Sequence, residues 1–316
     1  MKLTRMFLPL ILAGIITGCD STTTTSSEGA PETPKIALVM KSLANEFFKT
    51  MEDGAKTYHA EHAETFTLLA NGIKNEEDIA GQVALVENMI VQGVDAIVIA
   101  PADSKALIAV LARAMKEGIQ VVNIDNKLDA EVLAQRQLSI PFVGPDNRKG
   151  ARLAGEHLAG QLQAGDSVAL INGVPSAFNA IQRRLGFEES MKAAGMTIVA
   201  DQSAHWEMAK ANQVAAGILS EHPDLKAILC GNDSMALGAV AALKDAGRAE
   251  VRVVGFDNIS AVQELIKQSK VLATVDQHGD KLAVFGIEYA LQILASGTTP
   301  ADKETPVDLI LVEDLK

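Results

Sequence analysis

The chain has 316 residues, of which 48% are hydrophobic, and its 40 acidic and 28 basic residues give a formal net charge of −12. An acidic chain without a basic stripe repels phosphate backbones, so the composition argues against a nucleic-acid partner. About 280 residues follow the N-terminal segments described next, enough for one or two domains with a sizeable core.

The start of the chain is typical of an export signal. Lys2 and Arg5 give it a basic end, and the apolar run 6–16 that follows is too short to span a bilayer as a stable helix. Small residues then precede Cys19. We therefore interpret residues 1–18 as a signal peptide and expect the chain to be exported.

The tetrapeptide that ends at Cys19 resembles the lipobox of bacterial lipoproteins, in which the cysteine is lipidated and becomes the new N-terminus. Residues 19–35 are rich in Ser, Thr, Glu and Pro and lack large apolar side chains, so we expect a disordered tether. Together these features predict a body on the periplasmic or cell-surface side of the cytoplasmic membrane, attached only through the lipid.

Beyond the tether, short apolar runs alternate with amphipathic stretches. The expected strands are 36–40, 65–69, 96–100, 121–124, 167–172, 197–200, 227–230, 251–256 and 271–275. The expected helices are 47–59, 77–91, 104–117, 149–162, 180–194, 210–219 and 235–246. This repeated alternation predicts an α/β fold with parallel sheets covered by helices on both faces.

This number of strands is arranged more economically as two doubly wound lobes than as one sheet. A short extra segment at 139–146 interrupts the alternation near the middle of the chain. We therefore expect the chain to cross from one lobe to the other there.

Polar residues follow five of the expected strands, and open α/β sheets bind ligands beyond the carboxyl ends of their strands. These residues are Lys41 and Asn45, Asp125-Asn126-Lys127, Asn232-Asp233, Asp257-Asn258 and Asp276-Gln277. Any one of them alone is accounted for as a cap of the next helix, which is how we interpret Asp233. Five strand ends with one shared chemistry indicate a ligand site.

Aromatic residues make up only 4% of the chain, yet several lie beside these polar groups. Phe47 and Phe48 follow the first strand, Phe256 precedes Asp257, and the single tryptophan, Trp206, lies in a polar stretch with little core to join. Rings that stack on C–H faces, beside amides and carboxylates that bridge hydroxyls, suit a sugar or polyol. Core packing is the alternative for Phe47.

Four blocks of sequence carry a family resemblance. They are KSLANEFF at 41–48, VNIDNK at 122–127, CGNDSMALG at 230–238 and VVGFD at 253–257. In order and spacing they resemble the ribose- and allose-type substrate-binding proteins of bacterial ABC importers, from about residue 35 to the C-terminus. The resemblance implies two doubly wound lobes joined by three crossovers, a monosaccharide in the cleft, and hinge closure on binding.

The resemblance also implies how the chain is divided and which residues bind. The N-terminal lobe would comprise 36–138 with 277–305, and the C-terminal lobe 139–276 with 306–316. The residues implied to bind the ligand are Lys41, Asn45, Phe47, Phe48, Asp125, Asn126, Arg183, Trp206, Asn232, Phe256, Asp257 and Gln277. Arg183 matches the family's sugar-binding arginine if Gly186 sets the register, and Arg184 is the alternative.

Two positions depart from the ribose binders, which typically carry Asp-Arg where this chain has Asp125-Asn126, and Asn where it has Ala100. Lys41 is closer to the allose-type pattern. The loss of two donors predicts a set of hydroxyls different from that of ribose, as in a hexose, another pentose or a sugar alcohol.

The sequence gives little support for catalysis. It has no phosphate-cradling Gly-x-x-x-x-Gly-Lys loop, no His-Glu-x-x-His, no Gly-x-Ser-x-Gly and no paired cysteines. His59 and His62 are spaced like metal ligands on a helix, but a solvated face is the preferred interpretation because no further ligand is near. With Cys19 lipidated, Cys230 has no partner and is expected to be buried. We expect no enzyme activity, cofactor or metal.

The implied partners are the sugar or polyol and the importer's permease, and we expect a monomer. A sugar-responsive repressor with the same body is excluded, because a leader and lipid site stand where a basic helix-turn-helix is needed. A sensory co-receptor that presents bound sugar to a membrane kinase or chemoreceptor needs the same cleft and anchor, so it remains the alternative function.

Overall fold

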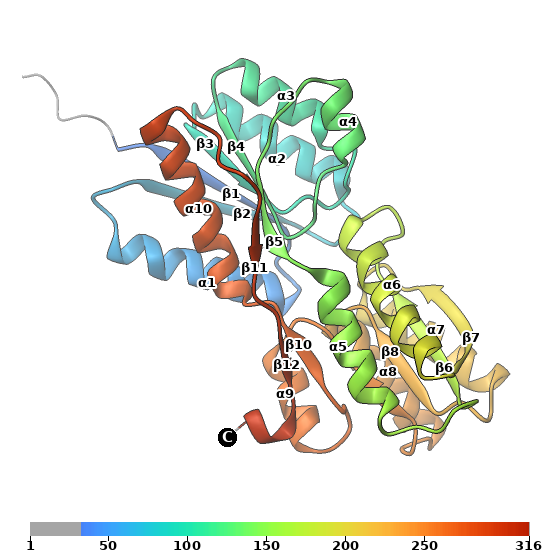
Figure 1. Cartoon of the computed structure of the whole chain (residues 1–316). Helices are drawn as coiled ribbons and strands as arrows, with labels where there is room; N and C mark the ends of the chain where they lie inside the picture. The colour runs from blue at the N-terminus through green and yellow to red at the C-terminus, as the bar shows by residue number, and fades with distance from the viewer. Residues whose placement is uncertain (1–32, 316) are drawn as a thin grey trace, which may run out of the picture. The chain divides into compact units, whose positions relative to one another are not determined.

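Strands and helices alternate along residues 33–315, which are the residues that the computed structural model describes (Figure 1). The strands are β1 Lys35–Ser42, β2 Thr67–Ile73, β3 Ala96–Ile99, β4 Gln120–Ile124, β5 Phe142–Pro145, β6 Ser167–Asn172, β7 Thr197–Ser203, β8 Ala227–Cys230, β9 Arg252–Val254, β10 Thr274–Asp276, β11 Lys303–Thr305 and β12 Asp308–Ile310. The helices are α1 Glu46–Glu61, α2 Ile79–Val91, α3 Ile108–Lys116, α4 Ala130–Gln135, α5 Asn147–Ala159, α6 Phe178–Ala193, α7 Met208–Glu221, α8 Asp233–Ala246, α9 Ser260–Lys267, α10 Gly279–Ser296 and the 3₁₀ turn η1 Val312–Asp314. The predicted signal peptide and Cys19 lie outside the described residues.

The first lobe is built on a parallel sheet of six strands in the order β11-β5-β4-β3-β1-β2. Side chains of β1 alternate between its faces, as the period of two in a strand requires. Ile36, Leu38 and Met40 join the core under α1 and α10, whereas Ala37 and Val39 join the core under α2 and α3. The sheet is therefore covered on both sides, as a parallel sheet needs.

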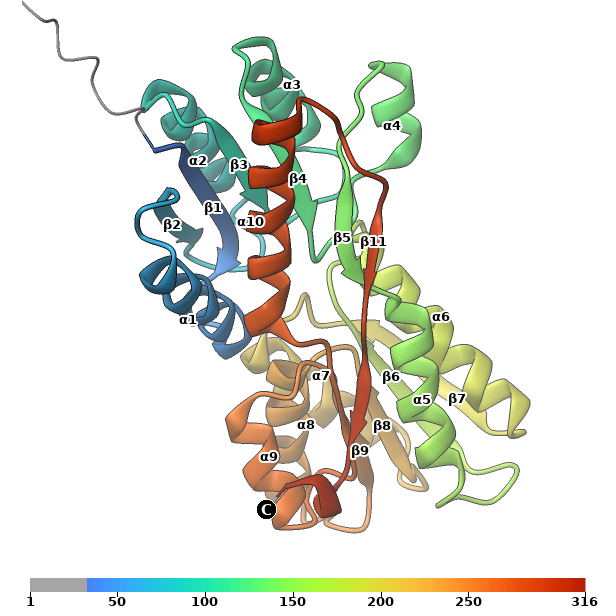
Figure 2. The ribbon, with the colours of Figure 1, turned by 60° about the vertical axis from the view of Figure 1, so that its left-hand side comes forward.

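Helix α10 lies along the first sheet over β3 and β4 (Figure 2). Gly286 lets it come this close, because a Cβ atom at that position would stand 2.6 Å from Val98 and 2.8 Å from Ile124. A larger side chain at position 286 would keep α10 further from the sheet.

The second lobe is built on a parallel sheet of four strands in the order β7-β6-β8-β9. Val168 and Leu170 of β6 face α5 and α6, and Ala169 and Ile171 face α7 and α8. A bridge from Val254 to Ala273 leads on to β10, which pairs antiparallel with β12. No helix within residues 33–315 is long and apolar enough to cross a membrane.

The chain passes between the two lobes three times, after β5, after β10 and after β11. The first crossing corrects the predicted boundary at residue 139. All four residues of β5 are buried, and the strand pairs in parallel with both β4 and β11, so it belongs to the first sheet. The C-terminal lobe therefore starts after Pro145.

Three strands run further than the sequence predicts. β1 extends through Lys41 to Ser42, so Lys41 lies within the strand, and β2 extends from the predicted end at 69 to Ile73. β7 extends from the predicted end at 200 to Ser203. Helices α4, α9 and α10 and strands β5, β11 and β12 were not predicted. The longer β2 ends three residues before Glu76, which is described with the site below.

Candidate functional site

The carboxyl ends of strands from both lobes surround one cavity with about 230 Å³ of empty volume. Its lining from the first lobe is Lys41, Asn45, Phe47, Phe48, Glu76 and Asp125. Its lining from the second lobe and the adjoining crossing is Asn179, Arg183, Trp206, Asn232, Asp257 and Gln277. The lining combines aromatic rings with charged and amide groups, which suits a small polar ligand.

Most of the residues that the sequence singles out are brought together here. Ten of the twelve predicted ligand-binding side chains line the cavity, and the two that do not are Asn126 and Phe256. The cavity also includes two residues that were not predicted, Glu76 and Asn179. Convergence of strand-end residues follows from the parallel sheets, whose carboxyl ends meet at one edge.

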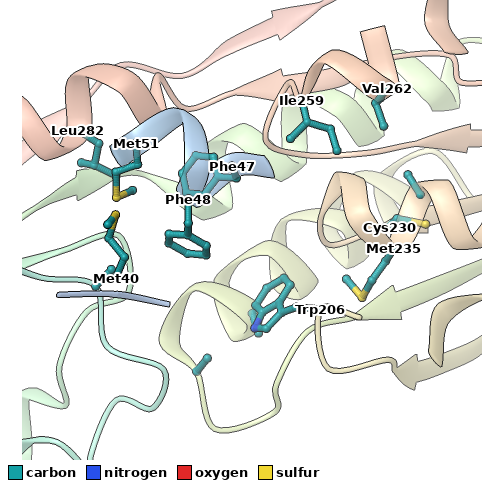
Figure 3. Close-up of a cluster of buried hydrophobic side chains, with 14 of the residues drawn as sticks. Met40, Phe47, Phe48, Met51, Trp206, Cys230, Met235, Ile259, Val262 and Leu282 are labelled. Carbon is teal, nitrogen blue, oxygen red and sulfur yellow. The ribbon is translucent and has the colours of Figure 1, made fainter. Parts of the chain in front are cut away.

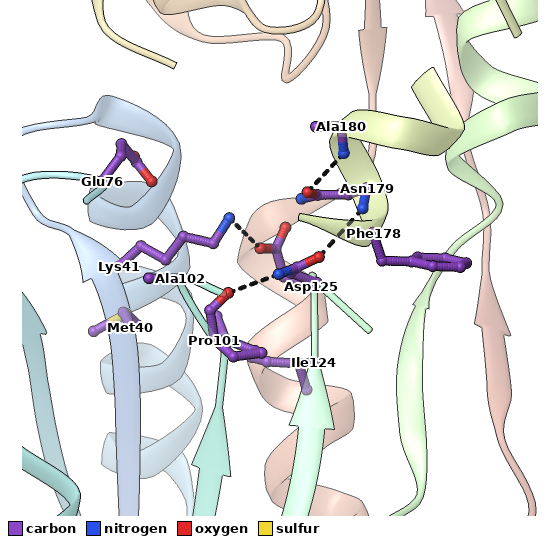
Figure 4. Close-up of polar contacts among 12 residues, drawn as sticks. Met40, Lys41, Glu76, Pro101, Ala102, Ile124, Asp125, Phe178, Asn179 and Ala180 are labelled. Atoms are coloured by element: carbon purple, nitrogen blue, oxygen red, sulfur yellow. Dashed lines mark hydrogen bonds and ion pairs between the residues drawn. The ribbon is translucent and has the colours of Figure 1, made fainter. Parts of the chain in front are cut away.

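A buried ion pair forms the wall from the first lobe. Lys41 Nζ lies 3.1 Å from Asp125 Oδ2, and both side chains are at most 4% exposed (Figure 4). β1 supplies the lysine, and Asp125 follows β4 with a backbone φ of +61°. A non-glycine residue in this left-handed region is uncommon, and such residues cluster at functional sites.

Asn45 has two roles in this wall. Its Oδ1 caps α1 by accepting a hydrogen bond of 3.1 Å from the backbone N–H of Phe47, which turns its Nδ2 towards the cavity. Nδ2 then donates to Glu76 Oε1 at 3.1 Å. Glu76 is buried, and burial raises the pKa of its carboxyl to about 7 although Lys41 opposes the rise.

Arg183 of α6 is the centre of the wall from the second lobe, and its side chain is buried. Nε donates to Asn147 Oδ1 at 2.7 Å, and Nη1 donates to the carbonyl of Gly231 at 2.9 Å and to Asp257 Oδ1 at 3.2 Å. Nη2 has no hydrogen-bond partner among residues 33–315. The guanidinium of Arg183 is thus fixed through Nε and Nη1, and Nη2 is left to donate to a ligand. This geometry suits recognition of a hydroxylated ring.

Arg184 points elsewhere. Its guanidinium is 42% exposed and pairs with Glu188 and Asp201 on the surface. Arg183, and not Arg184, therefore lines the cavity.

Gln277 and Asp257 complete the polar part of this wall. Gln277 Nε2 donates to Asp257 Oδ1 at 2.7 Å, and its Oε1 has no partner. Burial raises the pKa of Asp257 to about 7, and the Arg183 guanidinium opposes that rise. Asn232 mainly holds the structure, because its Oδ1 caps α8 by accepting from the N–H of Met235 at 2.9 Å.

Phe48 and Trp206 approach each other from the two lobes as apolar walls (Figure 3). The expectation that Trp206 has little core to join was wrong, since only 4% of it is exposed and it belongs to the main core cluster. Its ring rests on Gly173, where a Cβ atom would stand 2.0 Å from the ring. Lys41 Nζ lies 5.4 Å from the centroid of Phe48 and 5.7 Å from that of Trp206.

Asn126 lies behind the lining, because protein groups already occupy its amide. Its Nδ2 donates to the carbonyl of Pro101 at 2.9 Å, and its Oδ1 accepts from the N–H of Asn179 at 3.2 Å. The side chain therefore ties the two lobes together and does not line the cavity.

Phe256 also lies behind the lining and is not a wall of the cavity. Its ring centroid is 3.7 Å from the Arg183 guanidinium carbon. The rest of the ring lies in the core of the second lobe, next to Gly150. It holds the arginine in place. Asp233 likewise differs from its predicted role, since Asn232 caps α8 while Asp233 accepts from Thr274 Oγ1 at 2.7 Å and from Ile259 N at 3.0 Å.

Three buried polar atoms in the lining have no partner within residues 33–315, namely Glu76 Oε2, Trp206 Nε1 and Gln277 Oε1. A fourth, Asp125 Oδ2, is engaged by Lys41 Nζ in the ion pair described above. Buried polar groups are rarely left unsatisfied in native proteins, and each one costs about 1–3 kcal/mol. Two acceptors and one donor therefore line a cavity in which a ligand with several hydroxyls would satisfy them.

The described residues show no arrangement for a metal. Within 33–315 no group of three or more His, Cys, Asp or Glu is placed to hold an ion. His59 Nε2 and His62 Nδ1 instead lie 3.1 Å and 2.8 Å from the backbone carbonyls of Phe66 and Tyr58. Cys230 is buried as predicted, and burial raises the pKa of its thiol above the ordinary value.

Further contacts join the lobes through residues that do not line the cavity, and we call these the outer interlobe contacts. Asp103 Oδ2 accepts from Ser176 Oγ at 2.7 Å. The second contact joins Glu77 to His205, at 2.7 Å, and to Lys210. In the third, Glu46 Oε1 accepts from the N–H of Ser260 at 2.8 Å.

Comparison with known proteins gives consistent similarities. The model of a family described as "Periplasmic binding protein domain" matches residues 36–299. The chain is 57% identical to the D-ribose/D-allose-binding protein of Pseudomonas aeruginosa, over 95% of this chain and 97% of that protein. It is 34% identical to the D-allose-binding periplasmic protein of Escherichia coli, over 87% of this chain and 91% of that protein.

Solved structures show the same likeness. A solute-binding protein of an ABC transporter from Burkholderia multivorans, crystallised with an unknown ligand, has a TM-score of 0.87 and 56% identity, and the match covers 88% of this chain and 99% of that one. A periplasmic solute-binding protein from Actinobacillus succinogenes with bound D-allose has a TM-score of 0.84 and 35% identity, over 89% of this chain and 99% of that one.

Proposed function

Because the chain belongs to the periplasmic binding protein family, among its ribose- and allose-type members, we propose that it is the substrate-binding component of an ABC importer. Its two-lobed α/β body has the type I fold of that family. It captures a monosaccharide or sugar alcohol in the cavity between the lobes and delivers it unchanged to a membrane permease.

The observation that carries this proposal is the set of three buried polar atoms without partners, in a lining that also contains the rings of Phe48 and Trp206. A monosaccharide offers hydroxyl donors to the two acceptors and a hydroxyl or ring oxygen to the indole N–H. Its C–H face fits against an aromatic ring. One small ligand thus satisfies both the polar and the apolar parts of the cavity.

The ligand favours the closed arrangement because it contacts both lobes at once. Asp125 and Lys41 reach it from the first lobe, and Arg183 and Trp206 from the second. A ligand shifts a conformational equilibrium only through its different affinity for the two states. Opening would break the contacts of one lobe, so the bound ligand stabilises the closed form that the permease receives.

D-Allose and D-ribose are the first candidates, because they are the sugars in the names of the relatives. We favour D-allose, since Asn126 replaces an arginine of the ribose binders and its amide is already occupied by Pro101 and Asn179. Calorimetric titration of the full chain with both sugars tests this. Tighter binding of D-allose supports it, and equal affinity for the two sugars contradicts it.

Import is tested by uptake of labelled sugar into cells that produce the chain with its permease. Deletion of the gene is expected to abolish high-affinity uptake, and the wild-type gene to restore it, whereas the Asp125→Ala variant is not. Normal uptake in the deletion strain, with a lost response to the sugar, would instead establish the co-receptor role. No observation favours that role at present.

We also propose that the mature chain is a monomer, anchored to the membrane by lipid on Cys19 after removal of residues 1–18. The support is the sequence alone, because these residues lie outside the described part of the chain. Labelled palmitate should be incorporated into the wild-type chain and not into the Cys19→Ala variant. Equal labelling of both proteins would exclude this cysteine as the site.

A further inference from the structure

Glu76 has a buried carboxyl group, of which one oxygen accepts a hydrogen bond and the other does not. Its Oε1 accepts from Asn45 Nδ2 at 3.1 Å, and its Oε2 is buried without a partner. The side chain lines the cavity beside Lys41 (Figure 4). An acceptor left in this state needs a partner from the ligand, because the protein supplies none.

The local structure fixes the position of this carboxyl. Asn45 cannot turn its amide round, because its Oδ1 caps α1 at the N–H of Phe47. Nδ2 must therefore face Glu76 and orient it. The result is a preorganised group, which loses little side-chain entropy when a ligand binds.

The same residue also meets the second lobe. The backbone N–H of Glu76 donates to Glu207 Oε1 at 3.3 Å, and Glu207 precedes α7 of the other lobe. A ligand group bound to Glu76 is thus held at a place that is complete only when the lobes are together. Such a contact adds to the differential affinity that closure requires.

The charges around the carboxyl suit a hydroxyl partner. Lys41 from β1 faces it with positive charge, and Asp125 after β4 and Glu207 before α7 face it with negative charge. Burial raises its pKa to about 7, so both protonation states occur near neutral pH. A hydroxyl can donate to the carboxylate and accept from the acid, whereas a ligand carboxylate would be repelled by Asp125 and Glu207.

We infer that Glu76 is a specificity-determining residue whose Oε2 forms a hydrogen bond with one hydroxyl of the bound monosaccharide. This rests on the proposed function, since it assigns a further contact in the same cavity. Sugars that lack this hydroxyl, or carry it in the other configuration, leave a buried carboxyl unsatisfied and bind less well.

The test combines removal of the carboxyl with removal of each hydroxyl. Calorimetric titration of the full chain with D-allose, D-ribose and their monodeoxy analogues is carried out for the wild type, Glu76→Ala and Glu76→Gln. We expect Glu76→Ala to weaken binding of the parent sugar about 10- to 100-fold. For one deoxy analogue only, the same substitution should change affinity less than about threefold, because its hydroxyl partner is already missing.

Glu52→Gln is the matched control, because Glu52 is a mostly buried carboxyl of α1 in the same lobe and does not line the cavity. It should bind all sugars like the wild type. If Glu76→Ala is unstable, Glu76→Gln keeps the shape of the side chain and should show a smaller loss with the same single exception.

An equal penalty on every analogue would overturn the inference, because Glu76 would then affect the cavity as a whole and not one hydroxyl of the sugar. Wild-type affinity of both variants would overturn it as well. If the wild-type chain binds none of these sugars, the proposed function fails and this inference fails with it.

Discussion

The inside of the cavity and the outer interlobe contacts both join the lobes, but they differ in whether the protein completes them. Inside, three buried polar atoms, Glu76 Oε2, Trp206 Nε1 and Gln277 Oε1, have no partner within residues 33–315. At the outer contacts, Asp103, Glu77 and Glu46 all have partners from the other lobe. The inner groups therefore depend on a ligand, and the outer groups do not.

This difference separates two contributions to the free energy of lobe closure, one from the cavity and one from the outer interlobe contacts. The inner atoms are satisfied only by a ligand of matching hydroxyl pattern, so they determine affinity and selectivity. The outer pairs form whichever sugar is bound, and because they are partly exposed each contributes little. Substitutions in the cavity should therefore change binding affinity strongly and differently for each sugar. Substitutions at the outer interlobe contacts should change it weakly and equally for all sugars.

The largest effect is expected for Arg183→Ala, which should abolish detectable sugar binding. The substitution removes the fork that faces the cavity and leaves Asp257 buried without its cation. Arg184→Ala is the adjacent control, because that side chain pairs with surface carboxylates and should bind within about twofold of wild type. Titration calorimetry with D-allose measures both, and wild-type affinity in Arg183→Ala would refute the site.

Asp125→Ala should also reduce affinity more than about 100-fold and should lower the free energy of unfolding by about 3–5 kcal/mol, because Lys41 is left buried and unpaired. Lys41→Met combined with Asp125→Ala separates the two effects. Denaturant unfolding should show stability partly restored in the double variant, while calorimetry shows binding still lost. Recovery of binding in the double variant would mean that Asp125 acts only through Lys41.

The comparison extends to pH, because an inner and an outer carboxyl should have opposite effects. Burial raises the pKa of Glu76 from 4.5 to about 7, so the folded state holds a proton that the unfolded state has released. Its contribution to the free energy of unfolding must fall as pH rises from about 4.5 to 7, by at most about 1.4 kcal/mol per unit.

Lys210 and His205 instead lower the pKa of Glu77, so its contribution is present above 4.5 and is lost as pH falls through the folded pKa. Denaturant unfolding between pH 3 and 8 should show that Glu76→Gln flattens the neutral side of the profile and Glu77→Gln flattens the acid side. The same change of slope in both variants would remove the distinction between the two regions.

The smallest effect is expected for Glu77→Gln on binding. The substitution weakens the contacts with His205 and Lys210, which are about one third to one half exposed, and should weaken binding about two- to fivefold. The ratio of affinities for D-allose and D-ribose should stay the same, because the lining is unchanged. A changed ratio would show that the outer interlobe contacts also contribute to discrimination between sugars.

Much of the site could be predicted because parallel sheets bring their carboxyl ends to one edge. Asp125, Asn232, Asp257 and Gln277 follow predicted strands, and all four line the cavity. Glu76 was missed because the predicted strand ended at residue 69, which left it at the start of a helix. The actual end at Ile73 places it at the same sheet edge as the others.

Other features depend on tertiary packing and could not be read from sequence pattern. Asn126 and Phe256 follow strands like their neighbours, yet one bonds to backbone groups and the other packs behind Arg183. Trp206 lies in a polar stretch but packs on Gly173, which is distant in sequence. Strand β5 is too short for its sheet to be identified without its partners β4 and β11.

The central claim, that this cavity binds a monosaccharide, is tested most directly by fluorescence titration of the full chain, because its single tryptophan is a wall of the cavity. D-Allose, D-ribose, other pentoses and hexoses, and sugar alcohols are compared, with a melting scan in parallel. We predict a saturable change in Trp206 emission and a raised melting temperature, with D-allose effective at the lowest concentration. No saturable change and no stabilisation with any of these compounds would contradict the claim.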